Sequence, residues 1–300
     1  MFTILLSGAS GFIGSRLAQS FAADGHRVVP LVRGRPSSDH TVAWDPEAGS
    51  VDREALARTR PDVVINLAGE PIARRWTPKR RHRIRESRVR GTTALADALA
   101  SLPVKPRVFL SGSAIGYYGA HRDEPVDEAS APGPDFLAQT AHDWERATER
   151  AASAGIRVAL LRTGLVLARG GGVLARLLLP FRLGIGGRMG SGKQWMSWIA
   201  MNDAVRAVRF LVDSATASGP VNLVAPAPVR NVEFAETLAH VLHRPAVFPV
   251  PAMLLELLFG TMADSTILAS QRVMPKRLAG AGFEFRHPRL EEALRFELTR

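Results

Sequence analysis

Short apolar runs alternate with segments of helical spacing along the first half of the chain. The runs lie at residues 4–7, 28–32, 63–67, 108–111 and 158–161, and the helical segments lie at 13–23, 80–102 and 135–154. Continuous apolar runs of this length are typical of strands that are buried on both faces of a parallel sheet. The pattern therefore predicts an α/β fold, a Rossmann-type doubly wound parallel sheet, with ligands at the carboxyl ends of the strands.

The composition of the sequence changes after Arg162. Residues 164–193 hold nine glycines and five cations, and the following residues mix short apolar runs with prolines. We expect residues 1–163 to form the Rossmann domain that carries the predicted ligand site, with its sheet completed by parts of 195–225. Residues 164–300 are expected to form mainly a smaller, substrate-side C-terminal lobe.

A glycine-rich turn separates the first predicted strand from the first predicted helix. Gly8, Gly11 and Gly14 form the pattern G-x-x-G-x-x-G. Glycines at these positions permit a tight turn, and they let backbone N–H groups and the helix N-terminus approach a pyrophosphate. We therefore predict a dinucleotide site. Its expected contacts in this turn are Gly8, Ser10, Gly11, Phe12, Ile13 and Gly14.

The end of the second predicted strand indicates which dinucleotide is bound. An acid at this position would hold the ribose 2′-hydroxyl of NAD, but Arg33 follows the strand and no acid appears before Asp39. A guanidinium can pair with a 2′-phosphate, and the Ser10 hydroxyl could add to that contact; Arg35 follows two residues later. The prediction is therefore NADP(H) as cofactor, with Arg33 at its 2′-phosphate.

Composition narrows the class of protein. With 46% apolar and 22% charged residues, the chain can bury a sizeable core. It contains no cysteine, which excludes disulfides, thiolate metal sites and a thiol nucleophile. No run approaches the roughly 18 apolar residues of a membrane span, and the first strand begins too close to Met1 for a signal peptide. We expect a cytoplasmic location and no membrane partner.

The net charge of +11 comes from 39 Lys and Arg against 28 Asp and Glu. Nine of these cations fall within residues 74–90, which contain a single acid, Glu86. The run is either a solvated helix face or a source of residues, such as Arg88, that point toward phosphates. Because there is no basic tail and no interleaving of aromatic and basic residues, we expect an anionic small molecule as partner and no nucleic acid. The scattered histidines predict no metal site.

Motifs spread over the whole chain resemble one family. They include Asn66-Leu67-Ala68-Gly69-Glu70, Ser87-Arg88, Ser111-Gly112-Ser113, Gly116-Tyr117-Tyr118-Gly119, Trp144-Glu145, Leu161-Arg162-Thr163-Gly164 and Gly190-Ser191-Gly192-Lys193-Gln194. With the glycine turn, they resemble the extended short-chain dehydrogenase/reductases, in the atypical subgroup of NAD(P)-dependent "epimerase family proteins" with a C-terminal domain of unknown function. The resemblance implies an NADP(H)-binding Rossmann fold. We place further cofactor contacts at Leu67, Ala68, Gly69, Glu70, Arg88, Ser111 and Thr163.

One departure from the parent family concerns its catalytic pair. Active members carry Tyr-x-x-x-Lys on the helix that follows the serine strand, whereas here the Tyr position falls at Phe136 or Leu137 and the Lys position at Thr140 or Ala141. The chain has only two tyrosines, and both follow Ser113. If a tyrosine transfers a proton, it must be Tyr117 or Tyr118, with Ser113 polarising the substrate oxygen. The alternative is that the two tyrosines only line the pocket.

The glycine-rich segment after residue 164 contains G-x-x-x-x-G-K, a pattern like a phosphate loop. Gln194 stands where such a loop needs Ser or Thr to hold magnesium, which argues against a nucleoside triphosphatase. Arg188 and Lys193 instead become candidates to bind an anionic substrate, unless the segment is a plain surface loop.

These observations predict an NADP(H)-binding oxidoreductase or epimerase that acts on a small anionic or sugar-like substrate without the usual relay. The alternative is a non-catalytic NADP(H)-binding sensor or regulatory protein. A homodimer is compatible with either function.

Overall fold

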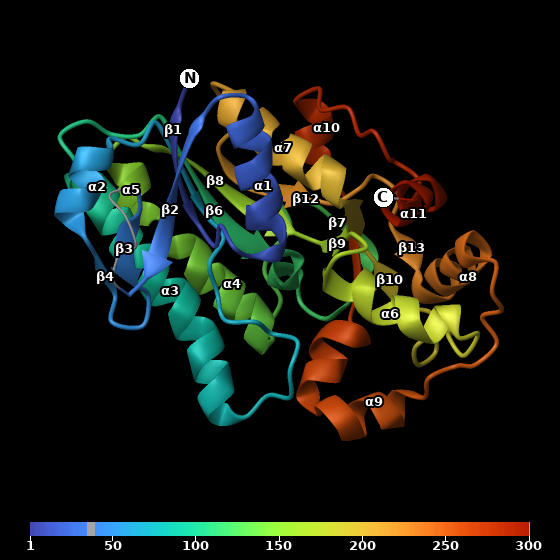
Figure 1. Cartoon of the computed structure of the whole chain (residues 1–300). Helices are drawn as coiled ribbons and strands as arrows, with labels where there is room; N and C mark the ends of the chain where they lie inside the picture. The colour runs from blue at the N-terminus through green and yellow to red at the C-terminus, as the bar shows by residue number, and fades with distance from the viewer. Residues whose placement is uncertain (35–39, 300) are drawn as a thin grey trace.

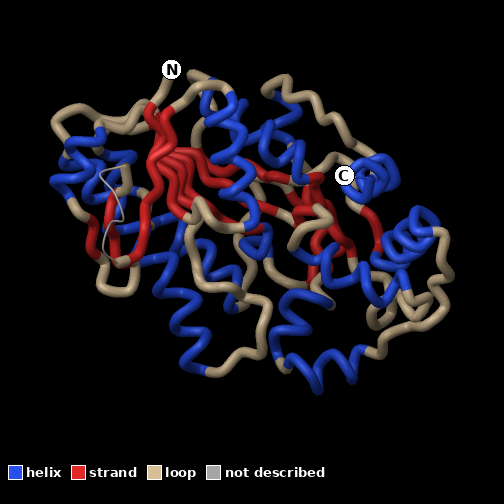
Figure 2. The backbone as a smooth tube through the Cα atoms, viewed as in Figure 1, coloured by secondary structure: helices blue, strands red, loops and turns tan. Residues whose placement is uncertain are grey.

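The computed structural model describes residues 1–34 and 40–299. A twisted central sheet carries helices on both faces, and a second group of helices and short strands lies beside its carboxyl edge (Figures 1 and 2). The expected doubly wound α/β fold is therefore confirmed. Arg35, the next arginine after Arg33, lies outside the described residues.

Eight strands form the central sheet. In order across the sheet they are β12 (Gly219–Leu223), β8 (Arg157–Thr163), β6 (Val108–Ala114), β5 (Val63–Asn66), β1 (Thr3–Ser7), β2 (Arg27–Arg33), β3 (Val42–Asp45) and β4 (Ser50–Val51). Neighbouring strands are parallel except for the β3–β4 pair. The chain moves outward from β1 in both directions, so the glycine turn that follows β1 lies at a topological switch point, where such folds bind ligands.

Two apolar cores cover the faces of the sheet. On one face, Leu6 and Ile65 pack with helices α1 (Phe12–Ala23), α7 (Met201–Asp213) and α10 (Lys276–Gly280). On the other face, Leu5 and Val64 pack with α2 (Arg53–Thr59), α3 (Pro78–Ser101) and α5 (Glu149–Ser153). Helix α4 (Phe136–Arg146) lies against β6 and α3. Burial on both faces explains why the central strands read as continuous apolar runs.

The C-terminal lobe has four helices and three short strand pairs in the described residues, and one of these pairs includes a strand from the first half of the chain. The helices are α6 (Gly172–Arg182), α8 (Asn231–Leu242), α9 (Ala252–Phe259) and α11 (Leu290–Thr299). The pairs are β9 (Leu165–Leu167) with β11 (Trp198–Ala200), β10 (Trp195–Met196) with β13 (Val229–Arg230), and β7 (His121–Val126) with β14 (Ser270–Val273). A 3-10 helix (Ile115–Tyr118) follows β6, and a π-helical turn (Ala263–Ile267) follows α9.

The helix expected over residues 135–154 is two helices, α4 and α5. The break falls at Thr148, whose hydroxyl donates to the carbonyl of Glu145 at 2.7 Å. Its backbone N–H bonds the same carbonyl, which is a tighter turn than an α-helix makes. The expectation of one continuous helix was therefore wrong, because local hydrogen bonding by a threonine overrode the helical pattern.

A row of polar side chains joins three strands at their carboxyl ends. Ser7, Asn66 and Ser111 are register neighbours on β1, β5 and β6. The Ser7 hydroxyl donates to Asn66 at 2.6 Å, and Asn66 donates in turn to Thr92 of α3 at 2.8 Å. Trp144 of α4 donates to the same threonine at 2.9 Å. The buried hydroxyl of Thr92 therefore ties two helices to the strand ends that carry the site.

The substitution Thr92→Val keeps the shape of the side chain but removes the acceptor shared by Asn66 and Trp144. Each buried donor left unpaired should cost about 1–3 kcal/mol in the free energy of unfolding. The matched control is Thr93→Val, because Thr93 is exposed on the same helix. Urea denaturation followed by circular dichroism measures both. Equal midpoints for the two variants would contradict the assigned role.

Candidate functional site

The glycine turn after β1 is closed tightly on itself. Gly8 has a φ of +70°, and the N–H of Gly11 donates to its carbonyl at 2.8 Å. A Cβ atom on Gly14 would lie 2.0 Å from that carbonyl oxygen, and one on Gly8 would lie 3.2 Å from the backbone of Leu67. Only glycine fits these positions, so the turn has the close approach that the sequence predicted.

The N-terminus of α1 is open to an anionic ligand. Its N-cap, Gly11, supplies no side-chain hydrogen bond, and no acid stands in the first turn, which contains Phe12 and Ile13. The first N–H groups of the helix therefore carry uncompensated positive potential. A cavity of about 530 Å³ runs along this end of the helix. It is lined by Ser10, Gly11, Phe12, Ser15, Arg16, Gln19, Gly170 and Gly171. The pyrophosphate of a dinucleotide fits this combination of helix N-terminus and cavity.

Arg33 is the last residue of β2 and its side chain is exposed. The strand lies next to β1, so Arg33 and the glycine turn occupy the same carboxyl edge of the sheet. Ser10 is also exposed, in the turn itself. Arg33 and Ser10, the two candidate ligands of a 2′-phosphate, are therefore both exposed at the edge of the sheet where the cofactor is predicted to bind.

The segment after β5 is held by hydrogen bonds to the first strand. The Ser7 hydroxyl accepts from the N–H groups of Leu67 at 3.0 Å and Ala68 at 3.1 Å. This places residues 67–70, the second group of predicted cofactor contacts, beside the glycine turn. The N–H of Glu70 is bound by the Ser87 hydroxyl of α3 at 3.0 Å.

Arg88 reaches from α3 to this same segment. Its guanidinium donates to the carbonyls of Glu70 at 3.1 Å and Ile84 at 2.9 Å, and a Cβ on Gly69 would come within 3.0 Å of it. Burial lowers the pKa of Arg88 to about 10, against the opposing effect of the Glu70 charge. The side chain remains a cation at neutral pH and lies beside the predicted cofactor contacts.

Several other cations within residues 74–90 form ion pairs. Arg80 and Arg83 bind Glu70 at 3.2 and 3.5 Å, and Arg85 binds Asp143 of α4 at 2.8 Å. The run therefore ties α3 to its neighbours as well as facing solvent. Nucleic-acid binding would need a face of free cations, and these ion pairs neutralise part of the positive charge on α3.

A second polar row crosses the sheet at the ends of β6, β8 and β12. Ser113, Arg162 and Asn222 are register neighbours on these strands. Arg162 is 3% exposed, and it binds both oxygens of Glu145 of α4 at 2.7 and 2.8 Å. Burial alone would lower the pKa of Arg162, but the hydrogen bonds and charge of Glu145 outweigh it and raise that pKa. Arg162 is therefore a cation at neutral pH, held in a buried ion pair with Glu145.

Glu145 also determines which way the Ser113 hydroxyl points. Ser113 donates its one proton to Glu145 Oε1 at 2.7 Å. A hydroxyl has a single proton, so only the lone pairs of Ser113 are left for a ligand. Held in this way, the hydroxyl can accept a hydrogen bond but has no proton to donate to a carbonyl oxygen. The hydroxyl of Ser111, by contrast, is buried without a hydrogen-bond partner among the described residues.

The two tyrosines occupy different environments. Tyr118 is 0% exposed; its hydroxyl donates to Asn222 at 2.7 Å and accepts from Arg162 at 3.0 Å. Burial raises the pKa of Tyr118 to about 12, although Arg162 and Asn222 act in the opposite direction. Tyr117 is 9% exposed; its ring centroid lies 3.4 Å from the Arg162 guanidinium, and its hydroxyl makes none of these hydrogen bonds.

The positions of the family's missing relay hold no titratable group. Phe136 packs its ring against Trp76, with centroids 5.4 Å apart, and under the guanidinium of Arg81 at 4.3 Å. The Thr140 hydroxyl donates to the Phe136 carbonyl at 2.7 Å. These residues pack α4 against the loop before α3.

The candidate substrate cations lie in the C-terminal lobe. Arg188 donates to the carbonyl of Ser191 at 2.9 Å, within its own loop, and Lys193 is exposed. Within the described residues, neither side chain is hydrogen-bonded to the strand ends. Thr163, the last predicted cofactor contact, ends β8 and donates to the Leu161 carbonyl at 3.1 Å.

Sequence reasoning missed the roles of Glu145, Arg162 and Asn222. A signal was present, because Arg162 directly extends an apolar run that is a buried strand. A charge in that position requires a buried partner. The pattern could not identify Glu145 as the partner, since the two residues meet only when α4 packs on the sheet.

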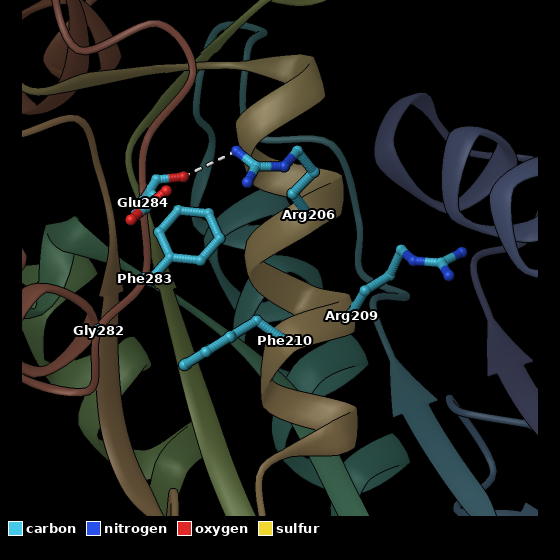
Figure 3. Close-up of a pocket in the computed structure, with 6 residues that line it drawn as sticks. All are labelled: Arg206, Arg209, Phe210, Gly282, Phe283 and Glu284. Atoms are coloured by element: carbon cyan, nitrogen blue, oxygen red, sulfur yellow. Dashed lines mark hydrogen bonds between the residues drawn. The ribbon is translucent and has the colours of Figure 1, made fainter.

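A further cavity, of about 340 Å³, lies between α7 and residues 282–284 (Figure 3). Arg206 in its wall donates to the Glu284 carbonyl at 2.8 Å, while Arg209 reaches away to the Ser20 carbonyl of α1 at 3.0 Å. Both cations bind protein groups, so we assign no ligand here. Across the described part of the chain, no cluster of acids and histidines could hold a metal ion, and no helix is long and apolar enough to cross a bilayer.

Comparison with known proteins decides the family. The sequence profile of the NAD dependent epimerase/dehydratase family matches residues 4–224, and that of a domain of unknown function, DUF1731, matches residues 250–297. The chain belongs to the NAD dependent epimerase/dehydratase family. The resemblance drawn from the motifs is thereby confirmed.

Relatives match over nearly the whole chain. The epimerase family protein Mb2239 of Mycobacterium bovis is 42% identical over 298 residues, which cover 99% of this chain and 98% of that protein. The chloroplastic SDR39U1 homolog of Arabidopsis thaliana is 37% identical and covers 98% of this chain and 86% of its own. The crystal structure of human epimerase family protein SDR39U1 (isoform 2) with NADPH superposes with a TM-score of 0.90 at 32% identity, covering 99% of each chain.

The variant Tyr117→Phe leaves Tyr118 as the only phenol in the chain. Its absorbance at 295 nm should titrate with a midpoint near pH 12, the raised pKa of Tyr118, and not near 10, the value of a free phenol. Between those two pH values the unfolded chain ionises while the folded one does not, so stability should fall as pH rises through this window. A midpoint near 10 with intact near-UV circular dichroism would contradict the assigned burial.

The variant Glu145→Gln leaves the buried charge of Arg162 without its counter-ion. We expect a loss of about 3–5 kcal/mol in the free energy of unfolding. The control is Glu149→Gln, since Glu149 pairs with Arg146 on the surface with both side chains 65% exposed; it should leave the urea midpoint unchanged. A Glu145→Gln midpoint equal to that of the control would show that the buried pair is not needed.

Proposed function

We propose that this chain binds NADP(H) at the carboxyl edge of β1, β2, β5 and β6 and acts as an oxidoreductase or epimerase. The observation that carries the proposal is the glycine-only turn facing an uncapped N-terminus of α1, with Arg33 at the end of the next strand. The human relative solved with NADPH, at 32% identity over 99% of the chain, supports the same cofactor.

The choice of NADP(H) over NAD(H) rests on charge at the ribose end. A carboxylate there would repel a 2′-phosphate, whereas an arginine binds it through two parallel N–H donors. Arg33 is exposed on the edge that the cofactor occupies, and Ser10 adds a hydroxyl in the adjoining turn. The residues present therefore fit the phosphorylated form.

When bound, the nicotinamide supplies or receives a hydride, and the protein must position the substrate and manage one proton. In our proposal the Ser113 hydroxyl, turned toward Glu145, accepts a hydrogen bond from substrate or cofactor. Tyr118 stays protonated and supports Arg162. Tyr117 is then the phenol left to exchange a proton with the substrate, since its hydroxyl is outside the buried network.

The substrate class follows from the cations of the C-terminal lobe. Arg188 and Lys193 are exposed on the loop between α6 and β10 and favour a small anionic or sugar-like molecule. The cytoplasmic location and a possible homodimer stay predictions.

The variant Arg33→Ala tests the cofactor assignment in a titration followed by nicotinamide fluorescence. We expect NADPH affinity to fall about 10- to 100-fold, the value of charged hydrogen bonds, with NADH affinity unchanged. The control is Arg27→Ala, because Arg27 is exposed at the opposite end of the same strand. Equal loss of NADPH and NADH, or a matching loss in the control, would contradict the role of Arg33. Failure of the wild type to bind either nucleotide would overturn the proposed function.

A further inference from the structure

Helix α9 turns apolar side chains to solvent. Met253, Leu254, Leu257 and Leu258 are all exposed, and Leu257 is 71% exposed. Only Leu255 of this helix is buried against the lobe. Scattered apolar residues on a surface are ordinary, but an exposed leucine-rich helix face indicates a binding partner.

More exposed apolar residues lie on two segments that run beside each other before this helix. Leu179, Leu183 and Ile185 belong to the end of α6 and the loop after it, and Val247 and Phe248 precede α9. The segments 182–190 and 244–250 are joined by hydrogen bonds, including Gly190 N–H to the Val250 carbonyl at 2.8 Å. Together with α9 they make nine of the eleven large apolar side chains exposed in the described residues. We call this surface the apolar face.

Cations and almost no acids accompany the apolar face. Residues 172–193 and 240–262 contain four Arg and one Lys against the single acid Glu256. Arg176 lies three residues before Leu179 and seven before Leu183, which puts the three on one side of α6. Arg176 and Arg182 are both exposed. The face therefore combines apolar side chains with positive charge.

From this combination we propose that the apolar face binds the surface of an anionic lipid bilayer. Leucines and a phenylalanine that enter the interface, with arginines at the headgroups, are the pairing by which peripheral proteins hold anionic membranes. A second copy fits less well, because a two-fold contact would set the cations of this face against themselves. We expected no membrane partner because the sequence has no segment long enough to span a bilayer. Binding to the surface of a bilayer does not require a spanning segment. The proposal is independent of the cofactor assignment.

Sedimentation of the purified full-length protein with vesicles tests the proposal. We expect binding to vesicles with about one third phosphatidylglycerol in phosphatidylcholine, much weaker binding to pure phosphatidylcholine, and release at high salt, as charge screening requires. The double variant Leu254→Glu with Leu257→Glu should lower the bound fraction at least fivefold. Arg176→Gln with Arg182→Gln should weaken binding to the anionic vesicles alone.

The matched control is Val104→Glu, which places the same charge on an apolar residue that is 67% exposed but lies outside the apolar face. It should bind vesicles like the wild type. Equal loss in this control, no binding to anionic vesicles, or equal binding to neutral ones would overturn the proposal. So would light scattering that shows a dimer which the Leu254→Glu, Leu257→Glu variant converts to monomer, since a second copy would then cover the face.

Discussion

The buried charge of Arg162 is the constraint on which the candidate site depends. A guanidinium at the end of a central strand is tolerated only with a buried counter-ion, and Glu145 of α4 supplies it. The pair fixes α4 against β8 and directs the Ser113 hydroxyl toward the carboxylate. Through Tyr118 and Asn222, the same network reaches β12 and the carbonyl of Met274, so it also anchors the C-terminal segment.

The positions of the parent type's tyrosine and lysine fall on α4, the helix that also carries Glu145 of this network. The positive charge of the network comes from a strand and is neutralised by a carboxylate. Tyr118 is engaged as a structural donor, and burial keeps it protonated. Tyr117 is a second phenol beside the network, with its ring on the Arg162 guanidinium. Around Arg162, the described residues therefore offer few groups that could exchange protons.

The two halves of the molecule use their cations differently. In the sheet domain, Arg80, Arg83 and Arg85 are neutralised by acids on neighbouring elements. On the apolar face of the C-terminal lobe, by contrast, Glu256 is the single acid among residues 172–193 and 240–262. The excess of positive charge thus supports packing around α3 and leaves a charged, apolar surface on this face.

Local patterns in the sequence were enough to predict the sheet, the glycine turn and Arg33 at the strand end. Strand burial and glycine-only turns leave a signature within a few adjacent residues, so no tertiary information was needed. The break at Thr148 and the partner of Arg162 were decided only in the folded structure. The partners Ser113, Glu145, Arg162 and Asn222 come from four elements, and their meeting depends on strand register and helix packing. Long-range pairing of this kind leaves no periodic trace in a single sequence.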